Sequence, residues 1–170
     1  MRLRLIGPFA LCLSLAIVHS AASAADQPPA APAAAAAATG KPPAEVVKNA
    51  PKGSLKNPFS VTQQDILNQG HELFMTNSCN GCHGGTGGGG MCPPLTGDVW
   101  FYGLDDDTLF RLITLGSLDL QKAGYEHLGG PTGMPMPPFS AILKSDEDLW
   151  KILTWIRSVY KGDPKKKTWQ

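Results

Sequence analysis

The chain has 170 residues and a formal net charge of +1, but its charges are unevenly distributed. Residues 58–160 carry five basic and eleven acidic side chains, a net charge of −6, while lysines collect in the flanking segments. This pattern excludes a nucleic-acid-binding protein, which needs a basic face. It predicts an acidic domain whose field steers a complementary partner at low salt.

Residues 1–25 have the pattern of a secretory signal peptide. Arg2 and Arg4 give a positive start, an apolar run follows at 5–18, and small residues at 22–24 form a cleavage site. The apolar run is shorter than the roughly 20 residues that a membrane span needs. We therefore expect export to the periplasm, cleavage of the signal, and no membrane span in the mature protein.

Residues 26–57 are rich in Ala, Pro and Lys and hold few large apolar side chains. Such a segment cannot offset the entropy of ordering, so we predict a disordered linker. A short alanine helix at 33–38 is the alternative. One ordered domain is expected at 58–162, followed by a basic tail at 163–170.

A first helix is predicted from about Thr62, because apolar residues then recur at helical spacing. They are Ile66, Leu67, Gly70, Leu73 and Phe74. Glycine inside a helix costs about 1 kcal/mol relative to alanine. Since Gly70 lies on the apolar face, we expect another helix to cross closely there.

This helix leads to Cys79-Asn80-Gly81-Cys82-His83, the spacing of a covalent attachment site for c-type haem. Each thiol adds to one haem vinyl group as a thioether, and His83 becomes the proximal iron ligand. A structural zinc site would need a second ligand pair, which the sequence lacks. A thioredoxin-like pair would follow a strand. The motif therefore predicts one covalent haem c on Cys79, Cys82 and His83.

The segment after the motif, residues 84–90, is a glycine-rich loop whose backbone can pass close to a flat cofactor. Cys12 leaves with the signal and the motif uses two thiols, so Cys92 remains alone. This count excludes a disulfide framework. We expect Cys92 to be a small buried residue near the haem, with an intermolecular bridge as the alternative.

Two more helices are predicted. One covers about 104–115, where the acidic residues 105–107 suit the positive helix end better than a metal or docking site. The other begins at Ser145, a helix-capping residue, and continues to about residue 160. The long connection at 116–133 is expected to border the exposed haem edge and to select the partner.

A low-spin electron-transfer haem needs a second axial ligand, and a thioether sulfur raises its potential relative to a second histidine. Met134 and Met136 are the candidates, because the other methionines lie in the signal, beside the motif or before Pro93. His71 is expected to face solvent. His127, in a glycine-flanked loop, is also less favoured as a ligand.

Together these features resemble the class I cytochromes c. The matching elements are Gly70, Phe74, the haem motif, Pro93-Pro94-Leu95, Met136-Pro137-Pro138-Phe139 and the terminal amphipathic helix. The resemblance implies an all-α, class I cytochrome c fold with three to five helices around one covalently bound haem. It also implies Met136 as the distal iron ligand, Met134 as the runner-up, and the Pro93 carbonyl as the hydrogen-bond acceptor of His83.

One departure from the family pattern concerns the end of the first helix. Phe74 precedes Cys79 by five residues where four is usual, so we expect that end to be loosened or bulged. Arg111, Trp100 and Tyr102 are further candidates for contacts with the haem propionates. A surface position on its helix is the alternative for Arg111.

Residues 80–95, 105–110 and 134–139 resemble, more narrowly, the cytochrome cL-like electron acceptors of PQQ methanol dehydrogenases, particularly the branch that serves lanthanide-dependent enzymes. This implies a periplasmic monohaem carrier, not an enzyme. It would accept electrons from a PQQ-dependent methanol or alcohol dehydrogenase and pass them to a downstream cytochrome c or oxidase. The alternatives are a haem enzyme or gas sensor with an open sixth position, and a haem subunit of a larger oxidoreductase.

Overall fold

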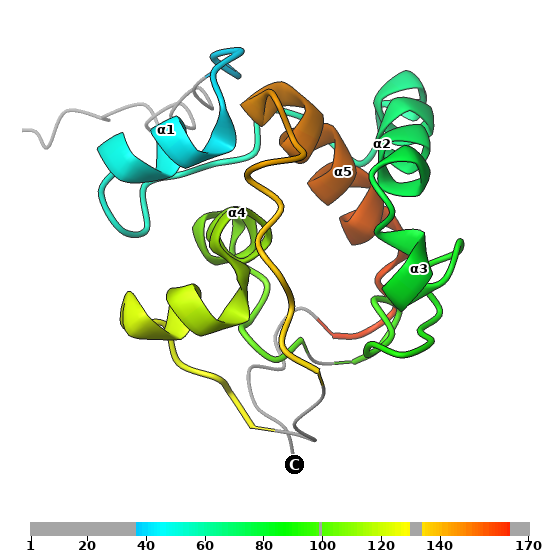
Figure 1. The fold of residues 1–170 in the computed structure, drawn as a ribbon. Coiled ribbons are helices and arrows are strands. Elements are labelled where there is room, and N and C mark those ends of the chain that lie inside the picture. Colours follow the sequence, from blue (N-terminus) through cyan, green and yellow to red (C-terminus); the bar gives the residue numbers. More distant parts are fainter. Residues whose placement is uncertain (1–36, 99, 130–133, 164–170) are drawn as a thin grey trace, which may run out of the picture. The chain divides into compact units, whose positions relative to one another are not determined.

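The computed structural model describes residues 37–98, 100–129 and 134–163. These residues form five helices and no strand, which confirms the all-α prediction (Figure 1). The helices are α1 (Pro43–Asn49), α2 (Gln64–Thr76), α3 (Asn80–His83), α4 (Asp106–Lys122) and α5 (Asp146–Val159). The predicted signal peptide and all but the first residue of the basic tail lie outside the described residues. None of these five helices combines the length and apolarity that crossing a bilayer requires.

Helices α2 and α5 lie side by side, and the close crossing expected at Gly70 is confirmed (Figure 1). A Cβ atom on Gly70 would overlap the backbone carbonyl of Lys151 and approach the Cβ of Trp155 to 3.0 Å. The facing sides of the two helices bury large apolar side chains, among them Phe74, Leu149, Ile152 and Leu153. Glycine is therefore needed at this position for the helices to approach.

Side chains cap both long C-terminal helices. Asp105 accepts a hydrogen bond from the Thr108 amide at 2.9 Å, and Ser145, the predicted cap, accepts one from the Asp148 amide at 3.1 Å. Helix α4 extends to Lys122, so the prediction that residues 116–133 form a connection without helix is wrong for 116–122. Gly116 has non-helical dihedral angles, so the helix bends at this residue and then resumes. The two differently directed parts of α4 can be followed in Figure 1.

The prediction of a disordered linker is wrong for residues 37–57, which include α1 and pack against α4 and α5. Polar contacts compensate for the scarcity of apolar side chains. The Asp146 carboxylate accepts hydrogen bonds from the Thr39 amide and hydroxyl, both at 2.8 Å, and from the Gly40 amide at 2.7 Å. The ordered part of the chain thus begins well before residue 58.

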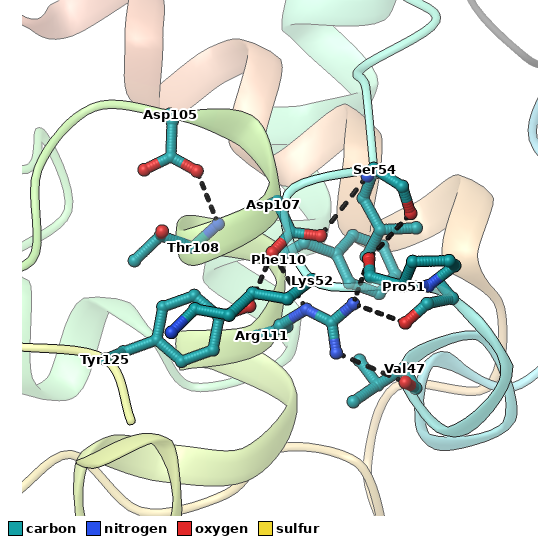
Figure 2. A network of polar contacts seen from close by, with 12 residues as sticks. Val47, Pro51, Lys52, Ser54, Asp105, Asp107, Thr108, Phe110, Arg111 and Tyr125 are labelled. Atoms are coloured by element: carbon teal, nitrogen blue, oxygen red, sulfur yellow. Dashed lines mark hydrogen bonds and ion pairs between the residues drawn. The ribbon is translucent and has the colours of Figure 1, made fainter. Parts of the chain in front are cut away.

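Arg111 makes the most extensive of these contacts, as Figure 2 shows. Its guanidinium pairs with Asp107 at 2.9 Å and donates to the carbonyl oxygens of Val47, Ala50 and Pro51 at 2.8–3.2 Å. Both charged side chains are buried, with 8% and 1% of their surface exposed. The N-terminal segment is therefore held on α4 by hydrogen bonds to a buried ion pair of that helix.

The acidic run at 105–107 has the structural role that was favoured for it. Asp105 caps α4, Asp106 pairs with Arg157 at 2.7 Å, and Asp107 pairs with Arg111. Within the described ranges, no group of three or more His, Cys, Asp or Glu side chains is placed to hold a metal ion.

Candidate functional site

The haem motif follows a bulge at the end of α2. The Cys79 amide donates to the Phe74 carbonyl, five residues earlier, at 3.1 Å. Ser78 adopts a φ of 64°, a conformation uncommon for residues other than glycine. The loosened helix end that the five-residue spacing predicted is thus present. It turns Cys79 into the core, where 8% of its surface is exposed, and the single turn of α3 then carries Cys82 and His83.

His83 is held in one orientation by a bond that the resemblance predicted. Its Nδ1 lies 3.0 Å from the Pro93 carbonyl oxygen, and since a carbonyl only accepts, Nδ1 carries the proton. The lone pair of Nε2 is then available to a metal. Burial lowers the pKa of His83, and the bond to Pro93 opposes this shift in part. The imidazole is therefore neutral at pH 7, as a metal ligand must be.

The glycine-rich loop folds back onto α3. The Gly89 amide donates to the His83 carbonyl at 2.9 Å, and the Cys92 amide donates to the Cys82 carbonyl at 3.1 Å. A Cβ on Gly90 would stand 2.9 Å from the Cys82 carbonyl oxygen, closer than side-chain atoms pack. Glycine at this position thus permits the loop to return over the haem motif.

No disulfide joins the three described cysteines, Cys79, Cys82 and Cys92. Burial raises the pKa of Cys79 to about 11, and burial together with a hydrogen bond to Cys82 raises that of Cys92 to about 11. Cys92 is half-buried beside the motif, close to its predicted position.

One cavity of about 310 Å³ brings most of the predicted site residues together. Apolar side chains from α2, α4 and α5 form much of its wall, as expected for a flat hydrophobic cofactor. The predicted residues that line it are Cys79, His83, Cys92, Pro93, Trp100, Tyr102, Met134 and Met136. Cys82 is half-buried one turn after Cys79. Cys82 is not among the lining residues. The Cys79 thiol, the His83 imidazole and a methionine thioether around one apolar cavity, with Cys82 on the adjoining turn of α3, fit a covalently attached haem.

The two candidate methionines differ in exposure. Met134 has 62% of its surface exposed, whereas Met136 is half-buried and belongs to the partly buried residues packed on the core. The Met136 backbone is also bonded on both sides, to the amide and the hydroxyl of Ser117. Its fixed backbone makes Met136 the better candidate for an axial ligand.

Two predicted propionate contacts need correction. Arg111 is absent from the cavity wall, because its guanidinium is turned toward the N-terminal segment; the alternative of a surface position is wrong as well. Trp100 lines the cavity, but its indole N–H donates to the Leu95 carbonyl at 3.0 Å and so supports the loop. Tyr102 lines the cavity and accepts a hydrogen bond from Gln121 at 2.5 Å.

His71 does not face solvent as expected. It is half-buried, stacks on Trp155 with ring centroids 4.6 Å apart, and has Nε2 2.8 Å from the Gly85 carbonyl oxygen. It therefore joins α2 and α5 to the glycine-rich loop. His71 is not among the residues that line the cavity.

Three further polar residues line the cavity: Ser117, Gln121 and His127. All three lie in the connection predicted at 116–133. For Ser117 and Gln121, the helical spacing of Leu120 after Ile113 and Gly116 is the signal that the helix continues. His127 stacks on Phe101 with centroids 4.9 Å apart. The polar atoms of Ser117, Gln121 and His127 could donate hydrogen bonds to the propionates of a bound haem.

A comparison with protein families identifies the family of this chain. The model of the family described as cytochrome c matches residues 67–160, more than half of the chain. The chain belongs to the cytochrome c family. Its fold is the all-α class I fold, its cofactor is one covalently bound haem c, and it is a monohaem electron-transfer protein.

Solved structures similar to this cytochrome c include two of cytochrome cL. That of the marine methylotrophic bacterium Methylophaga aminisulfidivorans is 32% identical with a TM-score of 0.45, and the match covers 60% of this chain and 58% of that one. That of Hyphomicrobium denitrificans is 33% identical with a TM-score of 0.42, covering 58% and 49%. The chain thus spans less than two thirds of either cytochrome. No curated protein sequence matches it significantly.

Proposed function

We propose that this cytochrome c is a periplasmic carrier that accepts electrons from a PQQ-dependent methanol or alcohol dehydrogenase and passes them to another cytochrome c or an oxidase. The observation that carries the proposal is that His83 and Met136 both line one largely apolar cavity. Bound haem c supplies a one-electron ferric–ferrous couple. If His83 and Met136 each held the iron of the bound haem, no position would be left for a substrate.

The residues of the chain have distinct parts in this function. Cys79 and Cys82 hold the haem covalently, so it is not lost during electron exchange. Pro93 fixes the tautomer of His83, which sets the strength of the proximal ligand. Tyr102, Gln121 and His127 form the polar part of the cavity that suits the propionates. The apolar wall from α2, α4 and α5 keeps water from the iron.

Two features support the choice of electron donor. The segments 80–95, 105–110 and 134–139 resemble the cytochrome cL-like acceptors of these dehydrogenases. The haem domain is also acidic, which favours a donor with a basic docking face. Leu118 and Met134, exposed by 58% and 62%, lie at the cavity wall and place an apolar surface where the haem edge would be reached.

The donor is tested by mixing the purified ferric cytochrome with a lanthanide-containing or a calcium-containing PQQ methanol dehydrogenase. With methanol present, haem absorbance should shift to the ferrous form, faster with one enzyme than with the other. The rate should fall as salt increases, because the attraction is between exposed charges. A mixture without methanol is the control. If neither enzyme reduces the haem, the proposed donor is wrong.

Carbon monoxide separates a carrier from a haem enzyme or gas sensor. The ferrous cytochrome should keep its six-coordinate spectrum on exposure to carbon monoxide, because the Met136 sulfur occupies the sixth position. The Met136→Ala variant should bind the gas rapidly. Rapid binding by the unmodified protein would favour the enzyme or sensor instead.

A further inference from the structure

The bend in α4 lies directly against the loop that carries Met136. Gly116 has a φ of 76° and a ψ of 166°, a conformation essentially restricted to glycine. A Cβ at this position would stand 2.7 Å from the Met136 carbonyl oxygen and 2.8 Å from the Pro138 nitrogen. Both are backbone atoms, which a rotamer change cannot move away. The bend therefore needs glycine both for its own conformation and for the closeness of the loop.

Ser117, the next residue, makes two hydrogen bonds with the backbone of Met136. Its amide donates to the Met136 carbonyl at 2.9 Å, and its hydroxyl oxygen accepts from the Met136 amide at 3.0 Å. Ser117 is buried, with 7% of its surface exposed, so water does not compete freely for these bonds. A third bond, from the Phe139 amide to the Ile113 carbonyl at 2.9 Å, fastens the far end of the loop.

The proline-rich sequence of the loop makes its hydrogen bond to the Ser117 hydroxyl important. Residues 135, 137 and 138 are prolines and have no N–H group, so the Met136 amide is the only backbone donor between 135 and 138. The prolines fix their own φ angles and leave the loop few ways to adjust. The Ser117 hydroxyl thus accepts the hydrogen bond of the single backbone donor in this stiff segment, the Met136 amide.

We propose that Gly116 and Ser117 are the positioning residues that hold the Met136 sulfur on the haem iron. The inference rests on Met136 as the axial ligand, which is part of the proposed function. Without the Ser117 hydroxyl, the Met136 amide loses its partner and the loop can withdraw more easily. An external ligand then replaces the sulfur at lower concentration.

The test is a titration of the ferric holoprotein with imidazole, followed by loss of the sulfur-to-iron charge-transfer band. Ser117→Ala should raise the apparent affinity for imidazole roughly two- to tenfold, the range that corresponds to one hydrogen bond. Ser117→Thr keeps the hydroxyl and should restore much of the original resistance. Ser158→Ala is the matched control, because that serine bonds only to the Trp155 carbonyl of its own helix. This control should leave the titration unchanged.

The outcomes separate the inference from the ligand assignment. If Met136→Ala keeps the charge-transfer band and Met134→Ala loses it, the ligand assignment fails. If Met136→Ala loses the band but Ser117→Ala and Ser158→Ala titrate alike, the ligand is right and the positioning role is overturned. Should Ser117→Ala fold poorly, Gly116→Ala gives a second test through the same loop. Unchanged imidazole affinity in that variant would also overturn the proposal.

Discussion

The two sides of the haem cavity are built differently. On the proximal side both thiols and the imidazole lie within five consecutive residues, and the bond that orients His83 reaches only ten residues ahead. On the distal side Met136 is held by Ser117, 19 residues earlier. The helix that carries Ser117 also carries Arg111, which bonds to Val47, 64 residues before it. The proximal side is thus built from one short stretch of sequence, whereas the distal side is built from segments that are far apart in the sequence.

This difference has a consequence for stability. Long-range contacts form only after the entropy of closing long loops has been overcome. The proximal ligand remains tethered by thioethers even in an unfolded chain, whereas Met136 depends on the whole distal assembly. We therefore expect the distal side to be the more sensitive to substitutions remote from the haem.

The largest effect is expected from Arg111→Met. Asp107, 1% exposed, would lose its ion-pair partner, and breaking one member of a buried pair costs about 3–5 kcal/mol. The free energy of unfolding of the holoprotein, measured with denaturant, should fall by that amount. Lys122→Met is the matched control, since its pair with Asp119 is exposed and is worth less than about 1 kcal/mol. If both variants lost the same free energy of unfolding, the buried contacts of Arg111 would not be what stabilises the distal side.

A smaller effect is expected on the proximal side from Gly70→Ala. The new methyl group would overlap the Lys151 carbonyl, and overpacking of this kind costs about 1–3 kcal/mol. Gly81→Ala is the control: it makes the same change within a helix, and nothing lies within 4 Å of the added atom. Denaturant unfolding of both holoproteins gives the comparison. If Gly70→Ala is as stable as Gly81→Ala, the close helix crossing is not required.

The proximal side could be predicted because its information is contiguous. The haem motif, the crossing at Gly70 and the cap at Ser145 each follow from neighbouring residues and a chemical, steric or hydrogen-bonding rule, whereas the bulge before Cys79 is predicted by the spacing usual in the family. The Pro93 contact needed the family resemblance, since nothing in the local pattern selects one carbonyl among several.

The distal side could not be predicted in the same way. The Ala/Pro/Lys-rich segment has a composition typical of disorder, yet buried carboxylates and Arg111 supply it with partners that composition does not reveal. The helix predicted at about 104–115 continues to Lys122, because it bends at Gly116, where the Met136 loop lies against it, and then resumes. In both cases a contact between distant segments overrode a sound local rule.

The smallest expected effect is a change in how the free energy of unfolding depends on pH at acidic pH. It tests the contribution of the Asp107–Arg111 pair alone. Burial alone would raise the pKa of Asp107, but hydrogen bonds from Arg111, Tyr125 and the amides of Gly53 and Leu55 outweigh it and lower the pKa. The carboxylate therefore adds stability that is fully present above the unfolded pKa of about 3.9 and is lost as pH falls through the lower folded value.

Asp107→Asn tests this contribution, because the amide keeps the shape of the carboxylate but does not titrate. Between about pH 4 and pH 2, unfolding free energies of the variant should depend less steeply on pH than those of the unmodified protein. Asp119→Asn should keep the original slope, because its exposed pair with Lys122 is screened by solvent. If all three proteins lose stability in parallel, another carboxylate governs the acid response. The distal side would then owe its cohesion to packing rather than to the buried ion pair.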